Sequence, residues 1–498
     1  MPDISTLHRG VWRHVGSGLK RLEGALIAKP KIRDVVVVLP GMIGSVLEKG
    51  GKDLWALSGS ALWNTLTSMG GWLQNLKLED PEADDGVTAT KLLDDVTILP
   101  GLVKIDGYGG ITRMIKGEFE VVLGSIGSPQ PANYYEFPYD WRRDNRITAR
   151  ALERFVGDKL RIWREATNNP DAKVILLAHS MGGLVSRYYC EVLGGWTQCR
   201  ALVTFGTPHR GSPNSLDFLV NGYKKLFVDL TEPLRSMPSA YQLLPIYPLV
   251  SDGGELHRVA EMHFPGVDSD MANDGLAFHR EIESAVVTNS SDRRYAGSFT
   301  TLPFVGTTQP TLQSATWSEG KLKASRTVPA GVDPLLSDGD GTVPRLSAIP
   351  IELSTDYRDT FVAEHHASIH NHRGVLQDIR ERIVHMQTEG LAAIRGPKTA
   401  RAGERAEISL DVEDVYTRDD QPVVSAAVVD GSVRGLVAVI APLDGRPPTQ
   451  MDMTEGDEGF SVDISGLDSG GYRLTIESVD RGPTAPSPVH DVFAVAGT

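Results

Sequence analysis

The feature that most constrains the fold is an abrupt change of pattern between residues 173 and 193. Residues 173–178 (KVILLA) form a continuous apolar run, which is typical of a parallel strand buried on both faces. The segment AHSMG (178–182) then leads directly into an apolar helical pattern at 183–193. The turn between such a strand and helix is so tight that only small residues fit two positions before and two after the serine. The pattern therefore predicts an exposed serine hydroxyl where the strand ends.

Similar apolar runs recur along the chain and alternate with helical patterns, the clearest of which covers residues 147–166. This alternation indicates βαβ units, which build a parallel sheet with helices on both faces. The other predicted strands lie at 34–39, 134–137, 200–205, 302–308 and 357–363.

Two long insertions interrupt this alternation, at about 52–76 and 210–300. The first holds Trp55, Trp63 and Trp72 among leucines, and the second has several apolar and aromatic clusters. Loops of this length inside a compact domain are usually functional or disordered, and their apolar content argues against disorder. We therefore predict a cap over an apolar pocket; the alternative is a helical subdomain with no gating role.

The composition changes near residue 395. The segment IRGPKTARAGERAE has the character of a linker, and short alternating runs follow it, separated by turn-forming segments such as GDEG and DSGG. Short strands with regular turns predict a small immunoglobulin-like β-sandwich. The expected organisation is a basic segment at 1–33, an α/β domain at 34–394 and an all-β domain at 395–498.

Charge and cysteine content narrow the class of protein. A formal net charge of −14 argues against a nucleic-acid binder and gives no long-range attraction to anionic lipid surfaces. The chain has only two cysteines, Cys190 and Cys199, so no disulfide framework is expected, which fits a reducing compartment. The sequence shows no signal-peptide pattern and no apolar stretch long enough to span a bilayer. We therefore predict a cytoplasmic protein.

The basic segment 1–33 carries seven Lys or Arg residues, with leucines and valines at helical spacing. We interpret it as a helix packed on the protein's own flank. The alternative is a basic amphipathic helix lying on a membrane surface.

The predicted serine, Ser180, has candidate chemical partners further along the chain. A serine hydroxyl is a weak nucleophile, and it needs a base that is oriented by a carboxylate. Downstream lie SDGDGTVP (337–344) and EHHASIHNHRG (364–374). This is the order Ser, Asp or Glu, His that α/β-hydrolases show.

Together these segments resemble the lecithin:cholesterol acyltransferase family of α/β-hydrolases, which includes lysosomal-type phospholipases A and phospholipid:diacylglycerol acyltransferases. The predicted sandwich lies outside the resemblance, and the disulfide-bonded lid of the secreted members has no counterpart here. The matching segments, in family order, are LPGMIGS (39–45), FPYDWRR (137–143), AHSMGG (178–183), FGTPHRGS (205–212), MPSAYQLLP (237–245), DGDGTVP (338–344) and EHHASI (364–369).

The resemblance implies an α/β-hydrolase fold with Ser180 as the nucleophile, Asp340 as the acid and His366 as the base. Asp338 is the near alternative for the acid, and His365 is the near alternative for the base.

An oxyanion hole would come from the backbone N–H groups of Met42 and Met181. Met42 follows Pro40-Gly41, and Met181 follows the serine at the start of a helix. Each such donor is typically worth about 2.7–4 kcal/mol of transition-state stabilisation.

Two metal sites fit these segments poorly. A calcium loop counted from Asp338 would place Val343 at the glycine position and Ile349 at the bidentate glutamate position. A zinc site built from the histidines of 364–374 has no carboxylate or cysteine companion at a recognised spacing. We expect no metal and no cofactor.

The resemblance implies a serine-dependent lipid ester hydrolase, similar to a lipase or phospholipase, that acts through an acyl-enzyme. Transfer of the acyl group to an alcohol is the first alternative. The second is an interaction protein that keeps a hydrolase scaffold and binds a protein partner through its sandwich. The expected partners are a lipid or other acyl ester, a peripheral membrane contact and a protein on the sandwich, with no nucleic acid. The natural substrate and the oligomeric state are not specified by the sequence.

Overall fold

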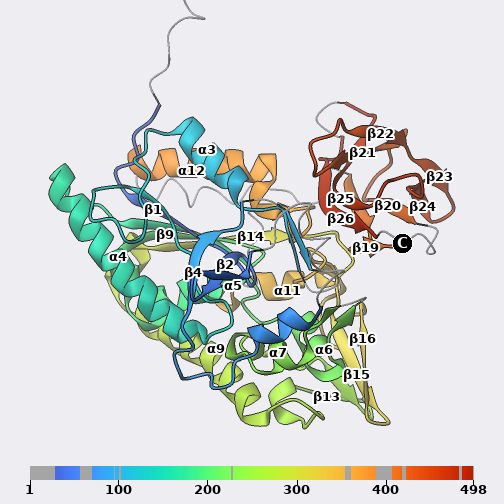
Figure 1. The fold of residues 1–498 in the computed structure, drawn as a ribbon, viewed down its shortest axis with the longest axis horizontal. Coiled ribbons are helices and arrows are strands. Elements are labelled where there is room, and N and C mark those ends of the chain that lie inside the picture. Colours follow the sequence, from blue (N-terminus) through green and yellow to red (C-terminus); the bar gives the residue numbers. More distant parts are fainter. Residues whose placement is uncertain are drawn as a thin grey trace, which may run out of the picture.

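The computed structural model describes most of the chain (Figure 1). Residues 1–28 of the predicted N-terminal segment, residues 57–69 with Trp63, and residues 389–405 around the predicted domain boundary lie outside the described part. The described ranges are 29–56, 70–94, 96–99, 103–225, 228–353, 360–388, 406–417, 422–481 and 485–496.

A parallel sheet forms the centre of the larger, α/β part of the molecule (Figure 1). Its strands pair in parallel throughout, and two of them, β1 and β8, are buried along their whole length because their sequences are continuous apolar runs. The sheet confirms the predicted α/β fold, with an expected strand at each position. In sheet order, the strands are β17 (Phe361–Val362), β14 (Thr300–Gly306), β9 (Cys199–Phe205), β8 (Val174–His179), β1 (Val35–Leu39) and β7 (Tyr134–Glu136).

Helices cover both faces of this sheet (Figure 1). Helices α3 (Gly109–Glu118) and α12 (Arg373–Thr388) lie on one face, and α4 (Asn145–Thr167), α5 (Met181–Arg187) and α9 (Ser269–Ser290) lie on the other. Helix α4 begins where the Asp144 side chain accepts a hydrogen bond from Arg146 N, and it ends at Asn168, which has the left-handed conformation common at helix C-termini.

The first predicted insertion forms short elements, and the second forms short elements followed by the long helix α9, which covers the central sheet (Figure 1). Helix α7 packs against the short helix η2, so the two insertions are in contact. The first insertion, predicted at about 52–76, has β3 (Lys52–Trp55) and η2 (Gly70–Leu76). Strand β3 shares a three-stranded sheet with β2 (Ser45–Lys49) and β4 (Val87–Leu92), which lie outside the predicted bounds. The second has α6 (Pro213–Asn221), α7 (Thr231–Arg235), α8 (Pro238–Tyr241), β12 (Val250–Asp252) and β13 (Glu255–His257), and β12 and β13 join β15 (Ser314–Ser318) and β16 (Lys321–Ser325) in one sheet.

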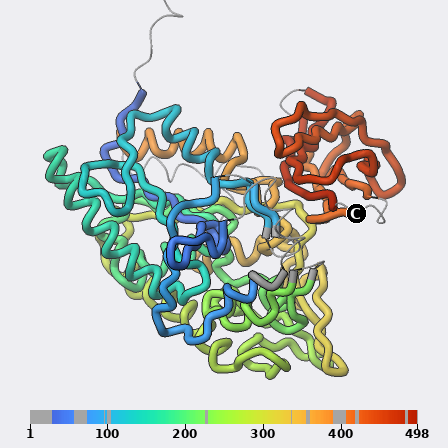
Figure 2. The backbone as a smooth tube through the Cα atoms, in the orientation of Figure 1, coloured from blue at the N-terminus to red at the C-terminus, as the bar shows by residue number. Residues whose placement is uncertain are grey.

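The C-terminal part is a sandwich of two sheets, set to one side of the α/β part (Figure 2). All neighbouring strands are antiparallel except β19 and β26, and the sheets enclose an apolar core that includes Ile408, Leu474 and Phe493. The predicted β-sandwich is confirmed. One sheet has β18 (Glu407–Asp411), β20 (Val423–Val429), β24 (Gly459–Asp463) and β23 (Thr454–Gly456); the other has β19 (Val415–Tyr416), β26 (Val489–Val495), β25 (Gly470–Ser478), β21 (Leu436–Pro442) and β22 (Thr449–Asp452).

Strand β26 of the sandwich lies against the α/β part. Val492 and Ala494 belong to the same apolar cluster as the central sheet, and β26 contacts the hairpin strand β5 (Thr97–Leu99). The sandwich is therefore joined to the α/β part by a buried surface as well as by the chain.

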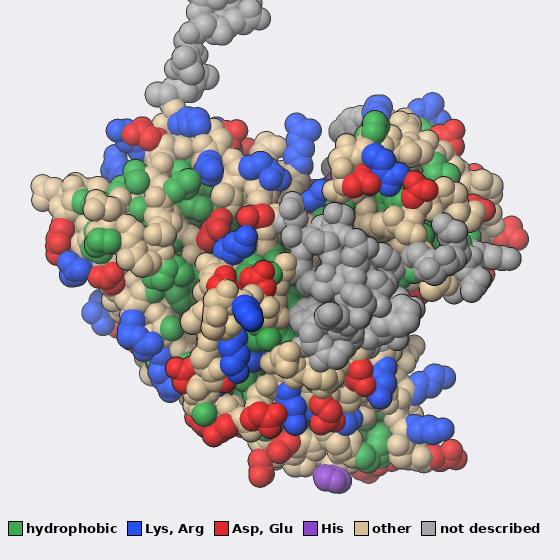
Figure 3. Space-filling model, viewed as in Figure 1, with side chains coloured by type: hydrophobic (Ala, Val, Ile, Leu, Met, Phe, Trp, Pro, Cys, Tyr) green, Lys and Arg blue, Asp and Glu red, His purple; other side chains and the backbone are tan. Residues whose placement is uncertain are grey.

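Three further features concern the charges on the surface, the apolar character of the helices and the state of the cysteines. On the face drawn in Figure 3, basic and acidic side chains are interspersed. No helix in the described ranges combines the length and apolar character needed to cross a bilayer. Cys190 and Cys199 are both free and buried.

Candidate active site

The turn that carries Ser180 is strained. Ser180 lies between β8 and α5 with φ 51° and ψ −125°, a conformation that residues other than glycine rarely adopt and that is common at functional sites. Ser180 N donates to Phe205 O at 2.9 Å, so the neighbouring strand holds the turn. A Cβ atom at Gly182 would lie 2.4 Å from Pro40 O. Only glycine therefore fits at this position, two residues after the serine.

A hydrogen-bonded chain joins three of the predicted site residues. His366 Nε2 lies 2.9 Å from Ser180 Oγ, and His366 Nδ1 lies 2.7 Å from Asp340 Oδ2. His366 is 5% exposed and Asp340 is 1% exposed. With the aspartate ionised, Nδ1–H donates to Asp340 and the unprotonated Nε2 accepts from the serine hydroxyl. The imidazole is thus oriented to take the serine proton.

Asp340 is held in place by the backbone around it. Its Oδ1 accepts from Thr342 N at 3.0 Å and from Val343 N at 2.7 Å, and its own carbonyl accepts from His366 N at 2.8 Å. A Cβ atom at Gly206 would lie 2.6 Å from Asp340 Oδ2. The carboxylate therefore fits only because β9 is followed by a glycine.

The near alternatives point elsewhere. Asp338 accepts from Thr308 N at 2.7 Å and lies 3.3 Å from Arg345 NH1. His365 Nδ1 faces Asp491 Oδ2 of the sandwich at 3.4 Å. The structure thus brings Ser180, Asp340 and His366 together and gives Asp338 and His365 other partners.

The loop with the predicted oxyanion donor Met42 follows β1. Gly41 N donates to Tyr108 Oη at 2.8 Å, and Tyr139 Oη donates to Pro40 O at 2.9 Å. Within the described residues, the amides of Met42 and Met181 have no acceptor. Both amides flank Ser180 in the fold, and their role as oxyanion donors stays a prediction.

Tyr108 and His179 form a link that the sequence analysis did not find. Tyr108 Oη lies 3.0 Å from His179 Nδ1, and His179 Nε2 lies 3.0 Å from the carbonyl oxygen of His366. Burial lowers the pKa of His179 well below its usual value, and the neighbouring His370 and His366 add to that effect. A neutral His179 can accept from the tyrosine and donate to His366, so the loop of Gly41 is linked to the loop of the base. Tyr108 lies in no recognised motif, so no sequence signal marked it.

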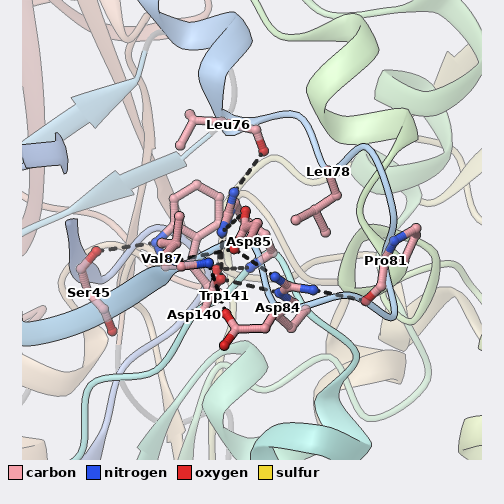
Figure 4. Close-up of polar contacts among 12 residues, drawn as sticks. Ser45, Leu76, Leu78, Pro81, Asp84, Asp85, Val87, Asp140 and Trp141 are labelled. Carbon is pink, nitrogen blue, oxygen red and sulfur yellow. Dashed lines mark hydrogen bonds and ion pairs between the residues drawn. The ribbon is translucent and has the colours of Figure 1, made fainter. Parts of the chain in front are cut away.

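The FPYDWRR segment forms a structural anchor (Figure 4). Arg142 is fully buried and binds Asp140 at 2.7 Å and Asp85 at 3.0 Å. Burial alone would raise the pKa of Asp85, but Arg142 and Arg143 hold it below its usual value. Trp141 Nε1 donates to Ser45 O at 3.2 Å. These residues therefore pack and form ion pairs within the α/β part, which is a structural role.

An apolar pocket opens at Ser180, with a volume of about 60 Å³. Much of its apolar wall comes from the second insertion, at the positions where a cap was predicted. Its lining includes Met42, Ser180, Phe218, Leu219, Leu234, Ala240, Leu243, Val343 and His366. Elsewhere, no group of three or more His, Cys, Asp and Glu side chains in the described residues could hold a metal ion.

Residues 53–270 match the family model of lecithin:cholesterol acyltransferase. The chain thus resembles that family, and the match supports an enzyme that acts on lipid esters by hydrolysis or by acyl transfer. No curated protein sequence matches the chain.

The solved structures that match the chain include two bacterial enzymes. The mature Bacillus licheniformis lipase BlEst2 is 14% identical, covers 69% of this chain and 88% of its own, and has a TM-score of 0.28. The Legionella pneumophila phospholipase PlaB is 10% identical, covers 92% of this chain and 90% of its own, and has a TM-score of 0.21. At such low TM-scores, these structures support no conclusion about the activity of this protein.

Proposed function

We propose that this protein is a serine-dependent lipid ester hydrolase that works through an acyl-enzyme. The observation that carries the proposal is the hydrogen-bonded chain from Ser180 through His366 to Asp340 at the mouth of an apolar pocket. These three residues supply an activated hydroxyl, and the apolar lining of the pocket suits an acyl chain next to it.

In the first half of the reaction, Ser180 Oγ attacks the ester carbonyl carbon while His366 Nε2 takes the serine proton. The negative charge that develops on the carbonyl oxygen is stabilised by the amides of Met42 and Met181 and by the N-terminus of α5. Asp340 stays ionised and stabilises the imidazolium. His366 then gives its proton to the departing alcohol oxygen, and the acyl group remains on Ser180.

In the second half, His366 takes a proton from water, and the resulting hydroxide attacks the acyl-serine. The carbonyl re-forms, the proton returns to Ser180 Oγ, and a fatty acid leaves. An alcohol can take the place of water in the same steps, which gives acyl transfer; the match to an acyltransferase family model favours this as the second candidate.

A fluorophosphonate probe tests the nucleophile, because it labels only an activated serine. We expect labelling of the wild type and of the matched control Ser284→Ala, whose serine lies exposed on α9. Ser180→Ala should not be labelled; equal labelling of all three would overturn the assignment. Fatty acid release from a lipid panel, with and without an added alcohol, then separates hydrolysis from transfer.

A further inference from the structure

A second, polar cavity lies between the site and the sandwich. Its volume is about 140 Å³, and both parts of the molecule contribute to its wall. From the α/β part come Lys104, Asn214, Pro310, Arg326, Asp340, Gly341, Thr342, His365, His366 and Ala367, and from the sandwich come Leu410, Asp411, Val412, Asp414 and Asp491. We call this space the interdomain cavity.

The interdomain cavity meets the apolar pocket at His366. Asn214, Thr342 and His366 line both spaces. Two buried polar atoms on its wall, Asn214 Oδ1 and His365 Nε2, have no hydrogen-bond partner among the described residues, and His365 is only 8% exposed. Buried polar groups are nearly always paired in folded proteins. These two atoms are therefore available to bind polar groups of a ligand.

The proposed chemistry decides which part of a substrate would occupy each space. His366 must give its proton to the departing alcohol oxygen, so the alcohol lies on the side of His366 away from the acyl chain. Since the apolar lining of the pocket suits the acyl chain, the alcohol is directed into the interdomain cavity. A polar wall favours an alcohol with further hydroxyl groups, which can satisfy Asn214 and His365.

The charges on the wall of the interdomain cavity further restrict the class of alcohol that it can bind. Asp411 lies 3.5 Å from Arg326, and Lys104 binds both Asp414 at 2.9 Å and Asp491 at 2.7 Å. Apart from the aspartate that binds His366, the wall thus has three carboxylates and two cations. Its excess negative charge disfavours an anionic group such as a phosphate.

The sandwich is tied firmly enough to serve as part of a binding site. Gln309 is fully buried; its Nε2 donates to Ile408 O at 3.1 Å and its Oε1 accepts from Leu410 N at 2.9 Å. Glu364, also fully buried, accepts from His490 N at 2.9 Å and from His490 Nδ1 at 2.7 Å. These bonds hold the sandwich wall against the loops of the reacting residues.

We propose, on the basis of the function proposed above, that the interdomain cavity binds the alcohol part of the substrate. The substrate class is acyl esters of neutral polyhydroxy alcohols, such as acylglycerols. The sandwich then selects the substrate by completing this cavity.

The test compares three decanoyl esters with the full-length protein: monodecanoylglycerol, cyclohexyl decanoate and decanoyl lysophosphatidylglycerol. The first two have alcohols of similar size, one polar and one apolar, and the third adds a negative charge. We expect the wild-type kcat/KM to be at least about ten-fold higher for the glycerol ester than for either of the others.

Two variants probe the wall, with Asp452→Asn as the control because Asp452 lies exposed on β22. Asn214→Leu should lower the preference for the glycerol ester over the cyclohexyl ester by about three- to ten-fold. Asp411→Asn should raise the relative rate with the lysophospholipid by about two- to five-fold. The control should change neither ratio, and circular dichroism checks the fold of each variant.

The outcomes separate the two proposals. If the esters are hydrolysed with Ser180 labelled but without the glycerol preference, or if the variants leave the ratios unchanged, the role of the cavity is wrong and the hydrolase proposal stands. If no ester is hydrolysed and Ser180 is not labelled, both proposals fail.

Discussion

The serine turn and the histidine loop meet at one hydrogen bond, yet they are held in different ways. The turn at Ser180 is held within the α/β part by Phe205 O and by the close approach of Pro40 to Gly182. The loop that starts at Glu364 is held partly by the sandwich, through His490. The nucleophile is thus set by packing within the α/β part, whereas the loop of the base is also held by the sandwich.

The largest effect is expected from a substitution next to the catalytic histidine. Asp340→Asn removes the carboxylate that orients His366, and the amide favours the wrong tautomer, so kcat should fall by about 10⁴-fold. Asp338→Asn is the matched control from the same loop, because Asp338 binds Thr308 N and Arg345 instead. Steady-state hydrolysis of a soluble ester measures both, and similar losses in the two variants would contradict the assignment.

The next largest effect is expected from a substitution in the serine turn. Gly182→Ala would place a methyl group 2.4 Å from Pro40 O, so we expect the free energy of unfolding to fall by about 1–3 kcal/mol, with loss of activity. Gly157→Ala is the control, because a Cβ atom there meets nothing within 4 Å in the middle of α4. It should raise the free energy of unfolding by about 0.5–1 kcal/mol. Thermal denaturation measures both, and a stable, active Gly182→Ala would show that the turn is not tightly packed.

The same contrast explains how much the sequence could predict. The strand, the small residues around Ser180 and the following helix are neighbours in the chain, so local pattern was enough to place the turn. The parallel sheet was equally visible, because its buried strands are continuous apolar runs. The strands of the sandwich are harder to place one by one; β20, for example, has the sequence VVSAAVV, whose small residues give a weak alternation.

The choice between Asp340 and Asp338, and between His366 and His365, could not be made from spacing. The two residues of each pair are one or two positions apart in the chain. Which side chain faces Ser180 depends on partners farther away in sequence, such as Thr308 for Asp338 and Asp491 for His365. The sandwich carries no chemical motif, so its approach to the histidine loop was not predicted either. Long-range packing supplied that information.

The smallest expected effect is the pH dependence of the ion pair between His490 of the sandwich and Glu364 of the histidine loop. Burial alone would lower the pKa of His490, but Glu364 raises it above its usual value of 6.5. A raised folded-state pKa stabilises the protein fully below pH 6.5, and this contribution is lost as the pH rises through the folded-state value. Because His490 is 36% exposed, the contribution should stay under about 1 kcal/mol. The Tm difference between wild type and His490→Gln should therefore be present at mildly acidic pH and shrink at alkaline pH. The control Arg434→Gln, which breaks the exposed pair with Asp480, should show no such trend near neutral pH, and a His490→Gln difference that grew with pH would contradict the assignment of the ion pair.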